Sequence, residues 1–117
     1  MTRLEVWKGR HIDYTLTLKD QDAVVVNISS STIKFMVKKN ITDLDADAVI
    51  TKTSAGGTEI TIDDGPRGIC TVYLTPVDTR SLTSGDYYWD VYAKLLSNKE
   101  YSSEPDEFEV KEVVRKT

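Results

Sequence analysis

The chain has 117 residues, of which 39% are hydrophobic and 29% are charged. This length suits one domain spanning residues 1–117, and these fractions are typical of a folded domain and not of a disordered one. The formal net charge is −4, which argues against nucleic acid or an anionic membrane as a partner, because both require a basic surface.

Membrane-spanning and secretory segments are also not expected. No apolar run reaches the ~18 residues of a membrane span, and the first ten residues, "MTRLEVWKGR", lack the apolar stretch of a signal peptide. We therefore expect synthesis in the cytoplasm. Cys70 is the only cysteine, so no internal disulfide can form. Alternation points Cys70 the same way as Val72 and Leu74, and we expect a buried, inert thiol.

Apolar and polar residues alternate along most of the chain, which is typical of strands with one buried face. The clearest runs are "IDYTLTL" at 12–18, "TIKFMVK" at 32–38, "EITID" at 59–63 and "DYYWDVYAKL" at 86–95. Turn-forming residues separate these runs. The pattern predicts strands at about 3–7, 12–19, 24–27, 32–39, 48–53, 59–63, 69–75, 86–96, 100–104 and 106–114. Only one helical turn is expected, beginning at Pro76 and capped by Asp78.

Short, regularly spaced strands predict an antiparallel sandwich or barrel. In the segment "SLTSGDYYWDV", residues Leu82, Gly85 and Tyr87 resemble the tyrosine corner of immunoglobulin-like sandwiches. In that motif the tyrosine hydroxyl bonds to backbone just upstream. We therefore expect an all-β chain with an immunoglobulin-like antiparallel β-sandwich fold.

The aromatic cluster at 87–92 divides into two faces under this alternation. Tyr87 and Trp89 point inward and are expected in the core. Tyr88 and Tyr92 fall on the outer face, where a neighbouring strand would contribute Lys34 and Met36. These four outward residues form a predicted interaction patch: Lys34, Met36, Tyr88 and Tyr92. Cross-strand packing that merely covers the sheet is the alternative interpretation.

No motif indicates catalysis. His11 is the only histidine, which excludes sites that need several. The segment 43–47, "DLDAD", has aspartates at alternate positions, as at the start of a calcium loop. However, Ala48 occupies the position of the required glycine, and Ser54 that of the bidentate glutamate. We expect no catalytic residue, no metal site, no cofactor and no enzymatic activity.

Four segments carry a resemblance to a known family: "WKGRHIDYTLTLKD", "ISSSTIKFMVKKNITDLDADAVI", "GICTVYLTPVDTRSLTSGDYYWDV" and "FEVKEVV". Together they resemble small immunoglobulin-like virion proteins of tailed bacteriophages and prophages, such as the N-terminal domain of upper baseplate proteins. The chain departs from the family at "EYSSEPDEFEV", where Glu107 stands near the place of an expected glycine.

The resemblance implies a structural virion component without catalysis, present in many symmetric copies and contacting other virion proteins. The implied role is that of a baseplate or tail-fibre adaptor, with a neck protein or a capsid decoration protein as alternatives. A carbohydrate-binding module for a bacterial surface polysaccharide is the alternative of another class. Trp7, Tyr88 and Tyr92 in one line would favour that module, whereas scattered aromatics would favour protein contacts.

Overall fold

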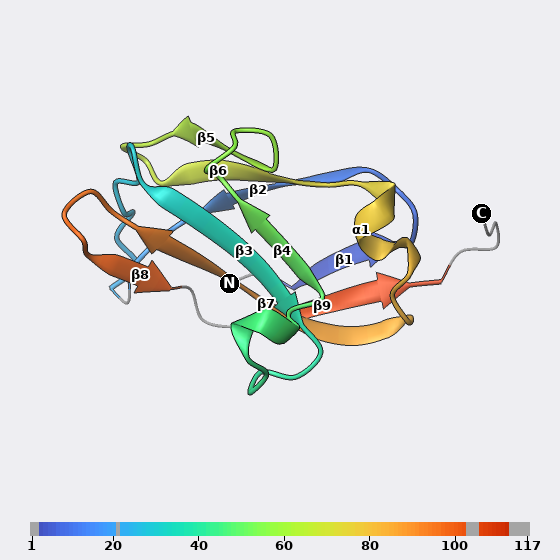
Figure 1. Ribbon diagram of the computed structural model, residues 1–117. Coiled ribbons are helices and arrows are strands. Elements are labelled where there is room, and N and C mark those ends of the chain that lie inside the picture. Colours follow the sequence, from blue (N-terminus) through green and yellow to red (C-terminus); the bar gives the residue numbers. More distant parts are fainter. Residues whose placement is uncertain (1–2, 21, 103–105, 113–117) are drawn as a thin grey trace.

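The computed structural model describes residues 3–20, 22–102 and 106–112, which form two β-sheets that pack face to face (Figure 1). The strands are β1 (Leu4–Trp7), β2 (Ile12–Thr17), β3 (Thr32–Lys38), β4 (Ile50–Thr53), β5 (Ile60–Asp64), β6 (Ile69–Leu74), β7 (Gly85–Lys94), β8 (Glu100–Ser102) and β9 (Asp106–Lys111). Helical structure among the described residues is limited to a 3₁₀ turn, η1 (Asp45–Asp47), and to α1 (Pro76–Arg80). The predicted all-β class is therefore confirmed.

The larger sheet has the strand order β1-β9-β7-β3-β4, and β8 also pairs with β7. The smaller sheet has the order β2-β6-β5. Strand pairing is antiparallel except between β1 and β9, which run parallel. This arrangement puts β7 in the interior of the larger sheet, between β3 and β9.

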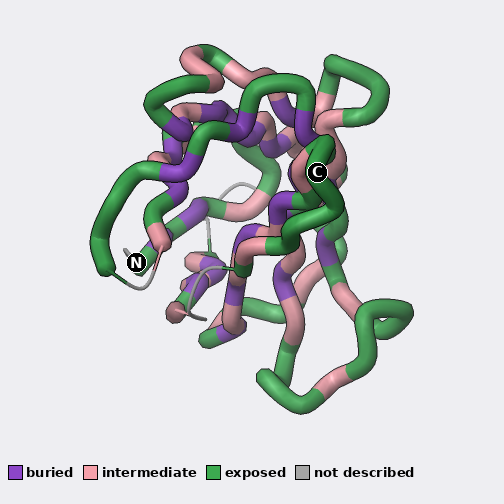
Figure 2. Tube along the Cα trace, turned by 90° about the vertical axis from the view of Figure 1, so that its left-hand side faces the viewer, coloured by how far each residue is buried: buried purple, intermediate pink, exposed green. Residues whose placement is uncertain are grey.

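The core lies between the two sheets and is built from alternate residues of each strand, as the buried segments in Figure 2 show. Trp89, Phe35 and Phe108 are its largest fully buried side chains. The ring of Phe35 lies 5.6 Å from that of Trp89 and 6.4 Å from that of Phe108, centroid to centroid. Such aromatic contacts add to the free energy gained from burying the rings.

The predicted helical turn is confirmed at α1, where a short polar network holds its first turn. The carboxylate of Asp78 accepts a hydrogen bond from the backbone N–H of Thr75 at 2.7 Å. The same carboxylate lies 2.7 Å from the ammonium of Lys52, whose side chain is only 7% exposed. Lys52 points into the core side of β4, so this ion pair supplies the partner that a buried charge requires.

The tyrosine corner forms at the start of β7. The hydroxyl of Tyr87 donates to the carbonyl of Thr83 at 2.7 Å, and Leu82 packs against the core. Gly85 begins the strand at φ +138°, a conformation that residues with a Cβ rarely adopt. The predicted bond from Tyr87 to backbone just upstream is thus confirmed.

The strand predicted at 24–27 is wrong, since this stretch makes only a single bridge between Lys19 and Val25. The carboxylate of Asp20 accepts hydrogen bonds from the backbone of Asp22 and of Val24, and Ala23 takes a positive φ of 62°. The Asp20 carboxylate thus takes the backbone donor of Val24, and beyond it Val26 donates to the carbonyl of Leu18 at 3.0 Å, so the pairing stops at one short bridge. Other strands differ from the expected bounds by one to three residues; predicted strand residues 103, 104, 113 and 114 lie outside the described residues.

Removing the hydroxyl of Tyr87 should test the corner. We expect Tyr87→Phe to lower the free energy of unfolding by about 1 kcal/mol, the usual net value of one hydrogen bond. Urea unfolding measures this, with Tyr88→Phe on the outer face as the matched control. Equal urea midpoints for the wild type and Tyr87→Phe would show that the bond adds nothing.

Truncating Trp89 should test the division of β7 into two faces. We expect Trp89→Ala to destabilise the fold by about 3–5 kcal/mol, because it removes the largest buried side chain and leaves a cavity. Tyr88→Ala, one residue away on the outer face, should cost far less. If Tyr88→Ala proved the more damaging of the two in chemical denaturation, the assignment of faces would be wrong.

Candidate interaction surface

The four residues of the predicted patch lie together on the outer face of the larger sheet. In the register of β3 with β7, Lys34 is opposite Tyr92, and Lys38 is opposite Tyr88. Met36 is opposite Asp90, between these two pairs. The side chains of Met36, Tyr88 and Tyr92 are half-buried, while Lys34 is exposed.

A shallow hollow lies at one end of the patch. It is lined by Met36, Lys38, Ile41, Tyr88, Trp89 and Asp90, and it encloses about 30 Å³. Pockets for small organic ligands usually enclose roughly 300–1,000 Å³. The hollow therefore suits the tip of one inserted side chain better than a whole small molecule.

Ile41 extends the patch beyond the strands, and the sequence pattern did not predict this. Its side chain is 56% exposed, and that of Leu44 in the same loop is 72% exposed. In the sequence, these two residues stand out only as isolated apolar residues in a polar loop. Neither of them belongs to a run in which apolar and polar residues alternate. The position of Ile41 beside the hollow depends on how the loop at 39–48 folds against β3.

Lys38 on β3 forms hydrogen bonds that hold this loop against the sheet. Its ammonium donates to the carboxylate of Asp45 at 2.7 Å and to the carbonyl of Asp43 at 3.1 Å. The cation lowers the pKa of Asp45 below its usual range. Burial raises the pKa of Asp90 on the neighbouring strand, although Lys38 partly offsets that rise. The edge of the hollow thus has a defined geometry and both signs of charge.

Tyr92 is oriented by a contact across the β7–β8 hairpin. Its hydroxyl donates to the carboxylate of Glu100 at 2.6 Å. This hydrogen bond raises the pKa of the Tyr92 phenol, because losing the proton would put two negative charges side by side. The contact fixes the hydroxyl of Tyr92 next to Glu100, the first residue of β8.

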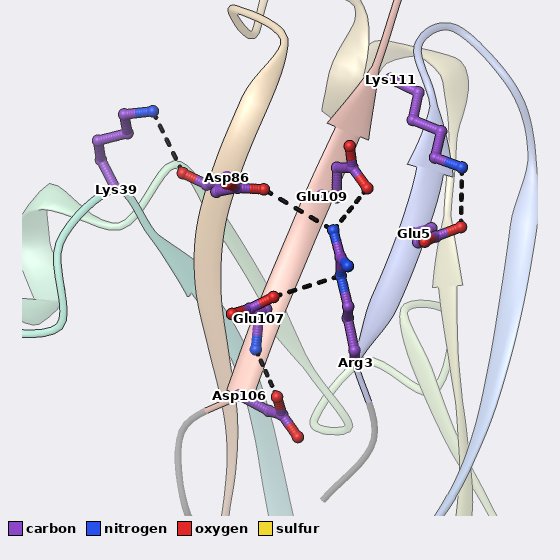
Figure 3. Close-up of polar contacts among 8 residues, drawn as sticks. All are labelled: Arg3, Glu5, Lys39, Asp86, Asp106, Glu107, Glu109 and Lys111. Atoms are coloured by element: carbon purple, nitrogen blue, oxygen red, sulfur yellow. Dashed lines mark hydrogen bonds and ion pairs between the residues drawn. The ribbon is translucent and has the colours of Figure 1, made fainter.

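A cluster of ion pairs occupies the same face at the junction of β1, β9 and β7 (Figure 3). The guanidinium of Arg3 lies 2.6 Å from Glu109, 3.4 Å from Glu107 and 3.9 Å from Asp86. Lys111 pairs with Glu5 at 2.9 Å. Sequence reasoning missed these contacts because they join residues about 100 positions apart, and only the parallel pairing of β1 with β9 brings them together.

The third exposed aromatic considered in the sequence, Trp7, lies apart from the patch. Trp7 lies on β1 and pairs with Lys111 of β9. Lys111 directly follows the residue of β9 that pairs with Gly85, the first residue of β7. Two cations lie over its ring, Lys111 at 5.3 Å and Arg10 at 5.6 Å from the centroid. Trp7, Tyr88 and Tyr92 therefore do not form one line.

Other residues with ionisable or reactive side chains are hydrogen-bonded within the fold or buried. Asp63 on the outer face of the smaller sheet accepts hydrogen bonds from Thr61 and from Thr71. Cys70 is buried, and burial raises its thiol pKa to about 11. Within residues 3–20, 22–102 and 106–112, no three residues of the types His, Cys, Asp and Glu gather as a metal site would require.

Comparison with known proteins adds no relative. The chain matches no family model and no curated protein. Over the part of the chain that the structure describes, no helix is both long and apolar enough to cross a membrane.

Calcium should leave the stability of this chain unchanged. In the 43–47 segment, Asp45 is paired with Lys38, and the Asp43 carboxylate accepts from the backbone of Asn40 at 3.1 Å. A cation would have to displace both contacts. We expect the same melting temperature in millimolar calcium and in chelator. A rise of several degrees with calcium would reveal specific binding to the folded state.

Proposed function

We propose that this chain is a non-enzymatic structural protein of tailed-phage virions that acts through protein contacts on the outer face of its larger sheet. The observation that carries the proposal is the set of Met36, Tyr88 and Tyr92 side by side on that face, with exposed Ile41 at its border. Methionine and aromatic residues are enriched in protein interfaces. A flat sheet face also suits a protein partner better than a small ligand.

The finer architecture that we propose is an immunoglobulin-like β-sandwich. In that fold, strands B, E and D belong to one sheet and strands C, F and G to the other, and a further strand C′ joins the second sheet in the variable type. The orders β2-β6-β5 and β9-β7-β3-β4 follow the same sequence of strands. The tyrosine corner at the start of β7 supports equating β7 with strand F.

The virion assignment rests on the resemblance of residues 7–20, 28–50, 68–91 and 108–114 to immunoglobulin-like virion domains. Within a particle, we propose the role of a baseplate or tail-fibre adaptor. A neck protein or a capsid decoration protein would use the same kind of surface, since a fold does not fix its location. The proposed partners are other virion proteins in a symmetric, multi-copy assembly.

The carbohydrate-binding alternative receives less support from the geometry. A sugar chain would stack on aromatic side chains that lie in one line. Trp7 instead lies two strands away from β7, and cations lie over its ring. The outer face of the smaller sheet is also a poorer contact surface. Its hydroxyls bond to one another or to Asp63, as in the 2.9 Å contact between Thr61 and Tyr73.

Replacing Tyr88 and Tyr92 together with serine should separate binding from folding. We expect the double variant to keep a cooperative thermal transition, because neither ring belongs to the core. Its incorporation into particles, or its association with a purified neighbouring virion protein, should weaken by a few kcal/mol at most. Tyr73→Ser, on the outer face of the smaller sheet, is the matched control and should assemble normally.

Two results would contradict this proposal. If the double variant folds and is incorporated as well as the wild type, the contact surface lies elsewhere. If it assembles normally but loses binding to a bacterial surface polysaccharide, the carbohydrate-binding function is correct instead.

A further inference from the structure

The strand β2 forms an open edge of the smaller sheet. Among residues 3–20, 22–102 and 106–112, β6 is the only strand that pairs with it. An edge strand presents a row of unpaired backbone N–H and C=O groups, which is a template for pairing with a further strand. β2 contains no proline, and its register with β6 runs without a bulge from Ile12 to Thr17. The strand itself therefore does not block pairing at this edge.

The hydrogen-bonding pattern shows which backbone groups of β2 face this open edge. The N–H of Leu18, just past the end of β2, donates to the carbonyl of Gly68 at 2.8 Å. The even-numbered residues of β2 therefore bond to β6, and the alternate residues direct their N–H and C=O groups the other way. The outward groups belong to Asp13, Thr15 and Thr17.

Lys19 extends this outward row by one residue. The carbonyl of Leu18 accepts a hydrogen bond from the N–H of Val26 at 3.0 Å. The N–H of Asp20 donates to the carbonyl of Val24 at 2.9 Å. The 24–26 segment thus pairs through the residues on either side of Lys19 and leaves the N–H and C=O of Lys19 on the open side.

The outward row carries one charge of each sign. Asp13 and Lys19 are both exposed, and within the described part of the chain neither makes an ion pair. Their positions in the sequence put them about 20 Å apart along an extended strand, so they do not pair within one copy. Thr15 and Thr17 lie between them, and threonine has a high strand propensity.

We propose that a second copy of this chain occupies the open edge, with the two β2 strands paired antiparallel about a two-fold axis at Leu16. In this register Asp13 is opposite Lys19 of the other copy, and Thr15 is opposite Thr17. The contact is isologous, so every pairing across it occurs twice, and the two smaller sheets join into one. This inference goes beyond the proposed function, because it concerns the other sheet.

Charge selects both this register and this occupant. Opposite charges across an antiparallel strand pair are stabilising, and like charges are destabilising. An axis at Thr15 would put Asp13 opposite Thr17 and Lys19 opposite His11, whereas an axis at Asp13 would set that carboxylate against its own copy. With the axis at Leu16, each of the two unpaired charges meets its opposite. The edge of β2 is thus complementary to itself.

Tyr14 lies beneath the open edge, between the two layers. Its side chain is half-buried, and its ring meets that of Phe108 edge-on at 6.5 Å between centroids. Its hydroxyl donates to the carbonyl of Glu5 on β1, the edge strand of the larger sheet. In the proposed register Tyr14 is opposite Leu18 of the other copy, so the added strand would cover the part of this ring that is still exposed.

The first test is sedimentation of the full-length chain over a range of concentrations. One strand edge is smaller than a standard interface of roughly 800 Å² per partner, so we expect a dimer with a dissociation constant between about 10 μM and about 1 mM. Asp13→Lys and Lys19→Asp should each weaken it by about tenfold, because each sets like charges opposite each other twice. Asp47→Lys, in the 39–48 loop, is the matched control for the change of charge.

Exchanging the two charges within one chain gives the sharper test. The double variant Asp13→Lys/Lys19→Asp restores opposite charges at both contacts, with their signs reversed. We expect it to dimerise about as well as the wild type, although each single variant does not. A separate structural role of either side chain would not produce this recovery.

The backbone pairing has its own test. Thr15→Pro removes one outward N–H and leaves the hydrogen bonds between β2 and β6 in place, so it should abolish the dimer. If this variant melts too low to assay, hydrogen exchange of the wild type supplies the same information. The amides of Asp13, Thr15 and Thr17 should exchange more slowly in concentrated than in dilute protein.

Four results would overturn the proposal. They are a chain that stays monomeric up to about 1 mM, a dimer that neither charge variant weakens, a double variant that does not recover, and a dimer that leaves the three outward amides unprotected. None of these removes the proposed function, whose own test is the incorporation of the Tyr88→Ser/Tyr92→Ser variant into particles. Failed incorporation of that variant would in turn leave the β2 pairing unaffected, because both tyrosines lie on the larger sheet.

Discussion

The packing of the Phe35 ring against the rings of Trp89 and Phe108 is the constraint on which the rest of the molecule depends. These rings come from β7, β3 and β9, the three central strands of the larger sheet, and they fill the space between the layers. Once the inward residues of β7 are committed to this core, strand geometry sends the alternate residues outward. The position of Tyr88 and Tyr92 on the surface is therefore a consequence of where Trp89 is buried.

Three of the edge strands, β1, β4 and β5, carry features that discourage the addition of another strand. On β1, the carbonyl of Glu5 accepts the hydroxyl of Tyr14. On β4, the N–H of Thr53 donates to Glu59 at 3.1 Å, and the inward ammonium of Lys52 is tied to α1. On β5, the register shifts between Ile62 and Asp64. Inward charges, bulges and capped backbone groups discourage strand addition at an edge.

Most of the fold could be predicted because alternation reports burial directly. Alternation points Tyr87, Trp89 and Cys70 inward, and all three are buried in strands that formed where expected. The failure at 24–27 has the opposite cause. Val24 and Val25 have strong strand propensity, but the side chain of Asp20 takes up nearby backbone donors, and both valines are exposed. A short run of β-branched residues predicts a strand even where a local turn competes with strand pairing, as it does here.

The candidate surface was predictable only in part. Its strand residues, including Met36 and Tyr92, follow from alternation once β3 and β7 are neighbours. The contribution of Ile41 and the shared contacts of Arg3 depend on the path of a loop and on the parallel pairing of β1 with β9. Neither leaves a periodic signal in the sequence.

The most direct measurement of the central claim is oxidative footprinting of the tyrosines, read by mass spectrometry, in the dilute chain and in its assembled state. Tyr88 and Tyr92 report on the outer face of the larger sheet, and Tyr73 reports on that of the smaller sheet. We expect assembly to protect Tyr88 and Tyr92 and to leave the labelling of Tyr73 unchanged. Protection of Tyr73 with undiminished labelling of Tyr88 and Tyr92 would contradict it.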